Sequence, residues 1–212
     1  MSANQVIRCA WLLVVALGAL PATLFAQHGF VQAGYGVDVR RFSGQETDAV
    51  FDANAGTVTL GGAGFLTPAV SGGIEVELGA TSEVRQSVTL TVAGRPDTIT
   101  TTYTSRRRSV SALAGFHSDA GRPVRVGLYG GLTFLAFRRV TSSDAPPIVL
   151  TDPQPPTVFT DRAVAPVMQV DIAIRLGRYL AAVGTVRARG LELTSELRGF
   201  SVQPGIAVRA SF

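Results

Sequence analysis

The sequence contains no lysine, because all 19 of its basic residues are arginine. A phosphate-binding P-loop, a Schiff-base lysine and the serine–lysine acylases each need an amine or ammonium group, so all three are excluded. The chain also has a single cysteine, Cys9, within a segment that we expect to be removed on export. The remaining chain would then hold no disulfide, no thiolate nucleophile and no cysteine-ligated metal.

Apolar runs are also too short to cross a bilayer as a helix. The longest, Cys9 to Leu20, has twelve apolar or small residues, whereas a transmembrane helix needs roughly 20. It follows Arg8 and precedes Leu24-Phe25-Ala26, which is typical of a secretory signal peptide. We expect residues 1–26 to be cleaved and residues 27–212 to form one domain; a retained N-terminal anchor helix is the alternative.

The positive charge is weak and dispersed. Without Arg8, 18 arginines stand against 15 carboxylates, a formal charge of +3. A nucleic-acid surface needs clustered basic residues with interleaved aromatics, so we expect no nucleic-acid partner. We find no metal-ligand spacing, no nucleophile elbow and no dinucleotide fingerprint in the sequence. We therefore expect neither a bound metal nor a cofactor.

The clearest positive signal is the last stretch of the chain, where polarity alternates with period two. One face would carry Phe200, Val202, Pro204, Ile206, Val208, Ala210 and Phe212. The other would carry Ser201, Gln203, Gly205, Ala207, Arg209 and Ser211. This pattern is typical of a strand with one apolar and one wet side.

Similar alternation recurs in eight segments, joined by short connections after the second, fourth and sixth and longer ones after the first, third and fifth. The segments cover residues 30–41, 57–66, 70–92, 98–116, 124–139, 163–176, 179–191 and 200–212. This asymmetry indicates an all-β fold, an eight-stranded antiparallel up-and-down transmembrane β-barrel with its apolar rows facing lipid. The loops 43–56 and 141–161 would lie outside the cell. The alternative is a soluble exported β-barrel or sandwich that binds a ligand and keeps those rows inside.

With its export signal, eight alternating segments and terminal Phe212, the chain resembles the small outer membrane β-barrels of the OmpA/OmpX type. The resemblance implies a monomer in the outer membrane, with outer membrane lipids and lipopolysaccharide as neighbours. It also implies that the barrel assembly machinery reads the last strand. Ile206, Val208 and Phe212 fit that signal, whereas Ala210 stands where the family usually has an aromatic residue.

Charged residues occupy the face that this fold turns inward. An eight-stranded barrel is just wide enough for side chains to fill it, so these charges must pair. The predicted network comprises Glu75, Glu77, Asp171, Arg125, Arg175, Arg187, Arg189 and Arg209, with Asp38, Gln169 and Gln203 nearby. A structural plug of the lumen is the favoured interpretation, and a gate that opens a narrow pore is the alternative.

A second group of arginines lies near the loop ends of neighbouring segments. It consists of Arg106, Arg107, Arg108, Arg138 and Arg139. These residues could bind lipopolysaccharide phosphates through charge-assisted bidentate hydrogen bonds, or form a solvated rim with no fixed ligand.

Catalysis is the weaker hypothesis. A lipid A deacylase or acyltransferase needs a nucleophile and an oriented base at the outer rim. The two histidines are His28, near the new N-terminus, and His117, which precedes Ser118 and Asp119 in a connection on the periplasmic side. We therefore expect a non-catalytic barrel with a structural role or a role in surface-loop interactions.

Overall fold

The computed structural model describes residues 29–43, 54–92, 95–118, 122–144, 155–192 and 198–212. The predicted signal peptide, residues 1–26, most of the predicted loop 43–56 and residues 145–154 of the predicted loop 141–161 lie outside these ranges. The described residues form nine strands. They are β1 (Gly29–Ser43), β2 (Asn54–Thr67), β3 (Val70–Gly79), β4 (Ser82–Val92), β5 (Arg95–His117), β6 (Val124–Asp144), β7 (Thr157–Arg175), β8 (Leu180–Glu192) and β9 (Arg198–Ser211).

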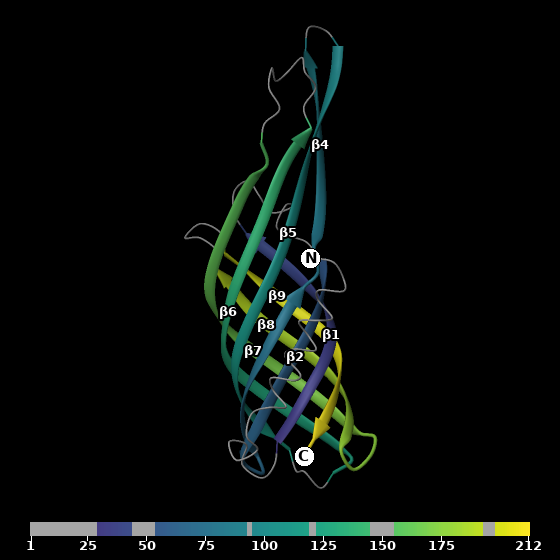
Figure 1. Ribbon diagram of the computed structural model, residues 1–212, viewed down its shortest axis with the longest axis vertical. Coiled ribbons are helices and arrows are strands. Elements are labelled where there is room, and N and C mark those ends of the chain that lie inside the picture. Colours follow the sequence, from purple (N-terminus) through teal and green to yellow (C-terminus); the bar gives the residue numbers. More distant parts are fainter. Residues whose placement is uncertain (1–28, 44–53, 93–94, 119–121, 145–154, 193–197) are drawn as a thin grey trace.

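Eight of these strands close into a ring. Neighbours in sequence pair antiparallel, β1 pairs with β9, and β3 pairs with β5 across the remaining gap. β4 pairs with β5 alone among the described strands and rises with it above the ring, as Figure 1 shows. The predicted eight-stranded antiparallel barrel is confirmed.

The third predicted segment, residues 70–92, is not one strand. β3 pairs with β5 up to Leu78 and Arg108, and pairing resumes with Ser82 opposite Ser105. On the β5 side, the three residues 79–81 therefore stand opposite only two, 106 and 107, and an extra residue on one strand bends it as a β-bulge does. The bend separates the part of β5 inside the ring from the β4–β5 hairpin above it.

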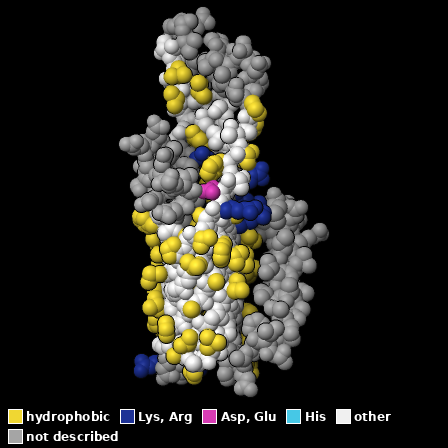
Figure 2. Space-filling model, turned by 90° about the vertical axis from the view of Figure 1, so that its left-hand side faces the viewer, with side chains coloured by type: hydrophobic (Ala, Val, Ile, Leu, Met, Phe, Trp, Pro, Cys, Tyr) yellow, Lys and Arg dark blue, Asp and Glu magenta, His cyan; other side chains and the backbone are white. Residues whose placement is uncertain are grey.

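Apolar side chains point outward from the ring and polar side chains point inward. The outward rows include Tyr35, Ile74, Leu128, Phe134, Met168, Ile172 and Val208, which are 49 to 63% exposed. Figure 2 shows apolar side chains spread over the outer wall. A soluble monomer rarely exposes so much apolar surface, whereas a barrel in lipid must. The soluble alternative with apolar rows inside is therefore wrong.

The two ends of the barrel differ as the connection lengths predicted. The C-terminus lies at the lower end in Figure 1, with the short connections β2–β3 and β7–β8. At the opposite end β6 runs on to Asp144 and β7 begins at Thr157. The predicted loop 141–161 was therefore too long, because strand pairing between β6 and β7 continues past the barrel rim. No helix in the described residues has the length and apolar character to cross a bilayer.

Candidate functional site: the charged lumen and its two rims

Glu77 is the centre of the charged lumen. Its carboxylate, 1% exposed, accepts hydrogen bonds from Arg107, Arg187 and Arg189. The distance from Arg187 Nη1 to Glu77 Oε2 is 3.0 Å. Arg107 comes from β5, the direct neighbour of β3, whereas Arg187 and Arg189 come from β8, four strands from β3 in either direction around the ring. The carboxylate therefore links opposite parts of the wall across the lumen.

Below Glu77 the network continues toward the turn end. Arg187 also pairs with Glu75 and donates from Nε to Gln169 Oε1 at 2.8 Å. Gln169 in turn donates to Asp171 at 2.9 Å, and Asp171 pairs with Arg209. Glu75 and Asp171, like Glu77, thus each accept hydrogen bonds from more than one side chain. This compensates the several kcal/mol that burial costs an ion.

Above Glu77 the network ends in Asp38. Its Oδ2 lies 2.7 Å from Arg107 Nη1 and 3.0 Å from Arg40 Nε, and Ser201 donates to its other oxygen. Asp38 was expected near the network and is part of it. Arg40 was not included in the predicted network, although the alternation of residues 30–41 places it on the same face as Asp38.

Arg107 corrects a sequence-based expectation. We grouped it with the arginines of the loop ends as a lipopolysaccharide contact, but its side chain is 4% exposed and points into the lumen. Strand alternation is the reason: Arg106 and Arg108 face outward, so Arg107 between them must face inward.

Six of the eight predicted lumen residues belong to the network. The other two, Arg125 and Arg175, lie below it at the turn end of the barrel. Arg125 donates to the backbone carbonyl oxygens of Pro68 and Ser118, at 2.7 and 3.2 Å. Arg175 is exposed at the end of β7. Neither takes part in the buried ion pairs described above. The alternation placed both on the inward face correctly, but it did not show that the lumen network stops before the last turn.

An aromatic cluster closes the lumen between the ion pairs and the turn end. The ring centroids of Phe65 and His117 are 5.0 Å apart, those of His117 and Tyr129 5.2 Å, and those of Phe30 and Phe65 5.8 Å. The Tyr129 ring lies against Gly115 of the neighbouring strand, where a β-carbon would collide with it. A cavity in the wall above this cluster has a volume of about 20 Å³, room for one water molecule.

His117 is part of this aromatic cluster. It is the last residue of β5, it is buried, and its Nε2 lies 2.6 Å from Ser71 Oγ. Ser71 is on β3, not in the connection with Ser118. Asp119 lies outside the described residues.

Four arginines face outward at the upper border of the apolar wall. Arg106 of β5 stands directly opposite Arg138 of β6 in the strand register. In the next outward-facing row, Arg108 of β5 and Arg162 of β7 lie on either side of Ala136 of β6. Figure 2 shows basic side chains gathered above the apolar area. Arg139 is different: it faces inward, and its guanidinium lies 5.5 Å from the centroid of the Phe159 ring and 5.9 Å from that of Tyr103.

A groove runs down the outer wall from these arginines. It has a volume of about 460 Å³ and is lined by Arg108 and Arg162 together with Val76, Leu78, Ser109, Val110, Phe134, Leu135, Ala136, Ala163 and Val164. Arg108 is on β5 and Arg162 is on β7, and these strands are two strand spacings apart, about 10 Å. Arg162 was missed by the sequence analysis because it lies between the predicted loop 141–161 and the predicted strand 163–176, whereas β7 already begins at Thr157.

Comparison with protein-family models gave no match, and comparison with curated proteins gave none. Solved structures do match. Neisserial surface protein A superposes with a TM-score of 0.52 and 11% identity over 88% of this chain and 100% of its own. Ail of Yersinia pestis, solved with the heparin analogue sucrose octasulfate, gives 0.51 and 14% over 85% and 98%. The N-terminal barrel domain of OprF from Pseudomonas aeruginosa gives 0.52 and 11% over 87% and 97%. The chain therefore has the fold of the small eight-stranded outer membrane β-barrels.

Proposed function

We propose that this protein is a non-catalytic outer membrane barrel with a closed lumen, and that it binds lipopolysaccharide of the outer leaflet at the four outward arginines Arg106, Arg108, Arg138 and Arg162. The observation that carries the proposal is their position at the border between the apolar wall and the polar rim. Lipid phosphates lie at this depth on the side of the membrane that the long connections face.

The groove below the arginines supports a lipid occupant. An acyl chain would lie against Val110, Phe134 and Val164 while its phosphate meets Arg108 and Arg162 above. Guanidinium groups form charge-assisted, bidentate hydrogen bonds with phosphate. Arg106 stands directly opposite Arg138, an arrangement that is destabilising between like charges. A bound phosphate removes that repulsion.

A closed lumen and the absence of catalysis complete the proposal. The ion pairs of Glu77 and the aromatic cluster below them fill the bore, which supports a structural plug more than a gate. His117 is enclosed by aromatic rings at the turn end, where it cannot meet an outer-leaflet substrate. We further propose export by residues 1–26 and recognition of β9, through Phe212, by the barrel assembly machinery.

The test measures lipid A bound to the purified barrel. Wild-type protein and the double variant Arg108→Gln/Arg162→Gln are extracted in mild detergent, and the lipid A carried by each is quantified by mass spectrometry. Hydrogen bonds with an ionised partner contribute about 1.5–3 kcal/mol each. The amount of lipid A bound to the double variant should therefore fall by about tenfold or more. The control is Arg85→Gln, because Arg85 is an exposed arginine on the hairpin. Equal amounts in the wild type and the double variant would refute the proposal.

A further inference from the structure

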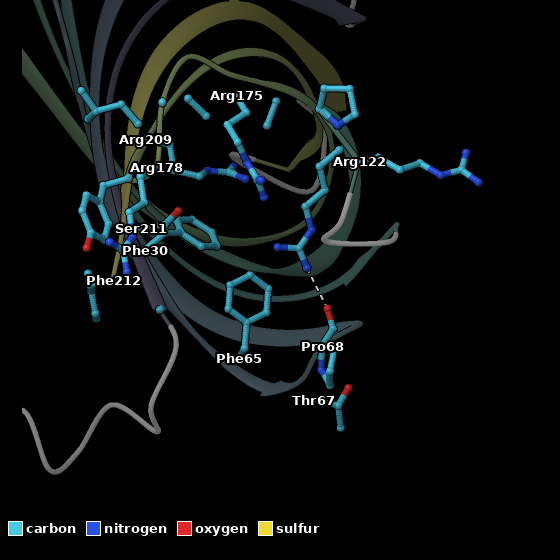
Figure 3. Close-up of a pocket in the computed structure, with 18 of the residues that line it drawn as sticks. Phe30, Phe65, Thr67, Pro68, Arg122, Arg175, Arg178, Arg209, Ser211 and Phe212 are labelled. Atoms are coloured by element: carbon cyan, nitrogen blue, oxygen red, sulfur yellow. Dashed lines mark hydrogen bonds between the residues drawn. The ribbon is translucent and has the colours of Figure 1, made fainter.

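The turn end of the barrel holds a cup in which the charged side chains of the described lining are all arginines. It has a volume of about 580 Å³, and its lining includes Arg122, Arg125, Arg175, Arg178 and Arg209. The described lining contains no aspartate or glutamate side chain. Figure 3 looks into the cup: Arg175 reaches over the opening, and the rings of Phe30 and Phe65 stand across from it.

Aromatic rings and backbone carbonyls hold two of these arginines in place. The Arg125 guanidinium lies 4.5 Å from the centroid of the Phe65 ring and donates to the carbonyl oxygens of Pro68 and Ser118. The Arg209 guanidinium lies 4.1 Å from the centroid of the Phe30 ring, and its Nη2 donates to Gln32 at 2.7 Å. Stacked, hydrogen-bonded guanidiniums lose little further conformational entropy when an anion binds.

The lining remains positive after its own acids are counted. Arg209 is balanced by Asp171, which lies on the lumen side of the cup. Carbonyl oxygens orient Arg125 but carry no full charge. The cations of the lining therefore outnumber its anions, and the low dielectric of a barrel wall strengthens their field inside the cup.

The cup is closed at its inner end. Phe30, Phe65, His117 and Tyr129 form the aromatic cluster between it and the ion pairs of the lumen. An anion that enters from the turn end thus stops at the guanidiniums instead of passing through. The geometry is that of a binding site and not of a pore entrance.

We infer that this cup binds the phosphate group of an organic phosphate. A volume of about 580 Å³ is typical of a small-molecule site and exceeds what a bare phosphate ion would fill. Several guanidiniums around one space suit a tetrahedral oxyanion, and the faces of Phe30 and Phe65 suit an organic body attached to it.

Two sources could supply this chemistry. One is a soluble phosphate ester on the periplasmic side. The other is the headgroup of an anionic phospholipid in the facing leaflet, since exposed Leu66, Leu176, Tyr179 and Phe212 surround the cup at the level of the short connections. The site lies at the opposite end of the barrel from Arg108 and Arg162. A failure of lipopolysaccharide binding there would therefore not contradict phosphate binding in the cup.

The experiment titrates the barrel, purified in an uncharged maltoside detergent, by isothermal calorimetry in two arms. One arm adds glycerol 3-phosphate and the other adds short-chain phosphatidylglycerol. Binding in both arms identifies a general phosphate site, and binding in the lipid arm alone identifies a headgroup site. In either case affinity should fall steeply as the salt concentration rises, because exposed guanidiniums are screened. No binding in either arm would overturn the inference.

Variants locate the site. Arg125→Gln/Arg175→Gln should weaken binding about tenfold or more, since it removes two charge-assisted donors. Arg178→Gln, at an exposed position in the connection β7–β8, should weaken binding severalfold without a risk to folding. Arg85→Gln on the distant hairpin should bind as the wild type does. Unchanged affinity in the Arg178→Gln variant and in a folded double variant, with folding checked by gel mobility before boiling, would overturn the inference.

Discussion

The barrel wall and the β4–β5 hairpin share β5 but differ in which of its faces is buried. In the wall, alternate residues are exposed and apolar or buried and polar, as at Val110 and Ser111 of β5. In the hairpin polarity still alternates, since Ser87 and Thr89 lie on one face and Val88 on the other, but both faces are exposed. On the hydroxyl-rich face Ser87 Oγ lies 3.2 Å from Thr100 Oγ1, and Thr89 Oγ1 lies 3.3 Å from Thr98 Oγ1. The burial of one face therefore ends just beyond the bend at residues 79–81, where the strands leave the ring and no longer enclose a lumen.

Two glutamates on either side of that bend show what the surroundings do to one type of interaction. Glu77 is buried and receives three arginines, whereas Glu83 pairs with Arg85 at 2.7 Å with both side chains largely exposed. A buried ion left without its partner costs far more than an exposed one, because water cannot solvate it. The comparison can be tested at three levels.

The largest effect should follow Glu77→Ala. Three buried arginines lose a shared carboxylate, and we expect the free energy of unfolding to fall by about 3–5 kcal/mol. Urea titration in lipid vesicles measures it, with the folded fraction read from gel mobility before boiling. Glu83→Ala is the matched control and should cost about 1 kcal/mol or less. Similar losses in both variants would mean that the lumen is well hydrated.

A smaller effect should follow a charge on the outer wall. Met168 is 63% exposed, midway along β7, and Met168→Arg should destabilise the barrel by about 2–4 kcal/mol in vesicles. Thr89→Arg on the hairpin should change the free energy of unfolding by about 0.5 kcal/mol or less. The same titration compares them. A Met168→Arg barrel as stable as the wild type would show that this face does not meet hydrocarbon.

The smallest effect should follow removal of the hairpin. Residues 84–103 are replaced by Asn-Gly, which joins Glu83 to Thr104, a directly opposed pair. Since the ring closes through β3 and β5 below this point, the free energy of unfolding should stay within about 0.5 kcal/mol of the wild type. A shortened protein that no longer shifts in mobility on boiling would show that the hairpin is needed to form the ring.

Period-two alternation was sufficient to predict the ring, because a residue on a strand can face only one of two directions. It placed Glu75, Glu77, Asp171, Arg187, Arg189 and Arg209 on one inward face. The same rule, applied to Arg107, would have placed it in the lumen. We instead treated Arg106–Arg108 as a charge cluster and ignored the strand that runs through it.

Pairings and the rims could not be predicted. Which arginine meets Glu77 depends on the stagger between strands, and strand patterns alone do not fix it. The outward groove needs Arg108 and Arg162 in one row on either side of β6, a consequence of register. The cup at the turn end joins residues from six strands and three connections, so no local pattern indicated it.

The pairing of β1 with β9 also governs how such a molecule can be made. Phe30 lies beside Ser211, so the seam can form only after residues 30–211 have all been delivered to the membrane. Until then each partly assembled sheet has two edge strands with unpaired backbone N–H and C=O groups, which can pair with other chains and cause aggregation. Biogenesis must therefore shield the nascent sheet and complete closure as one late event.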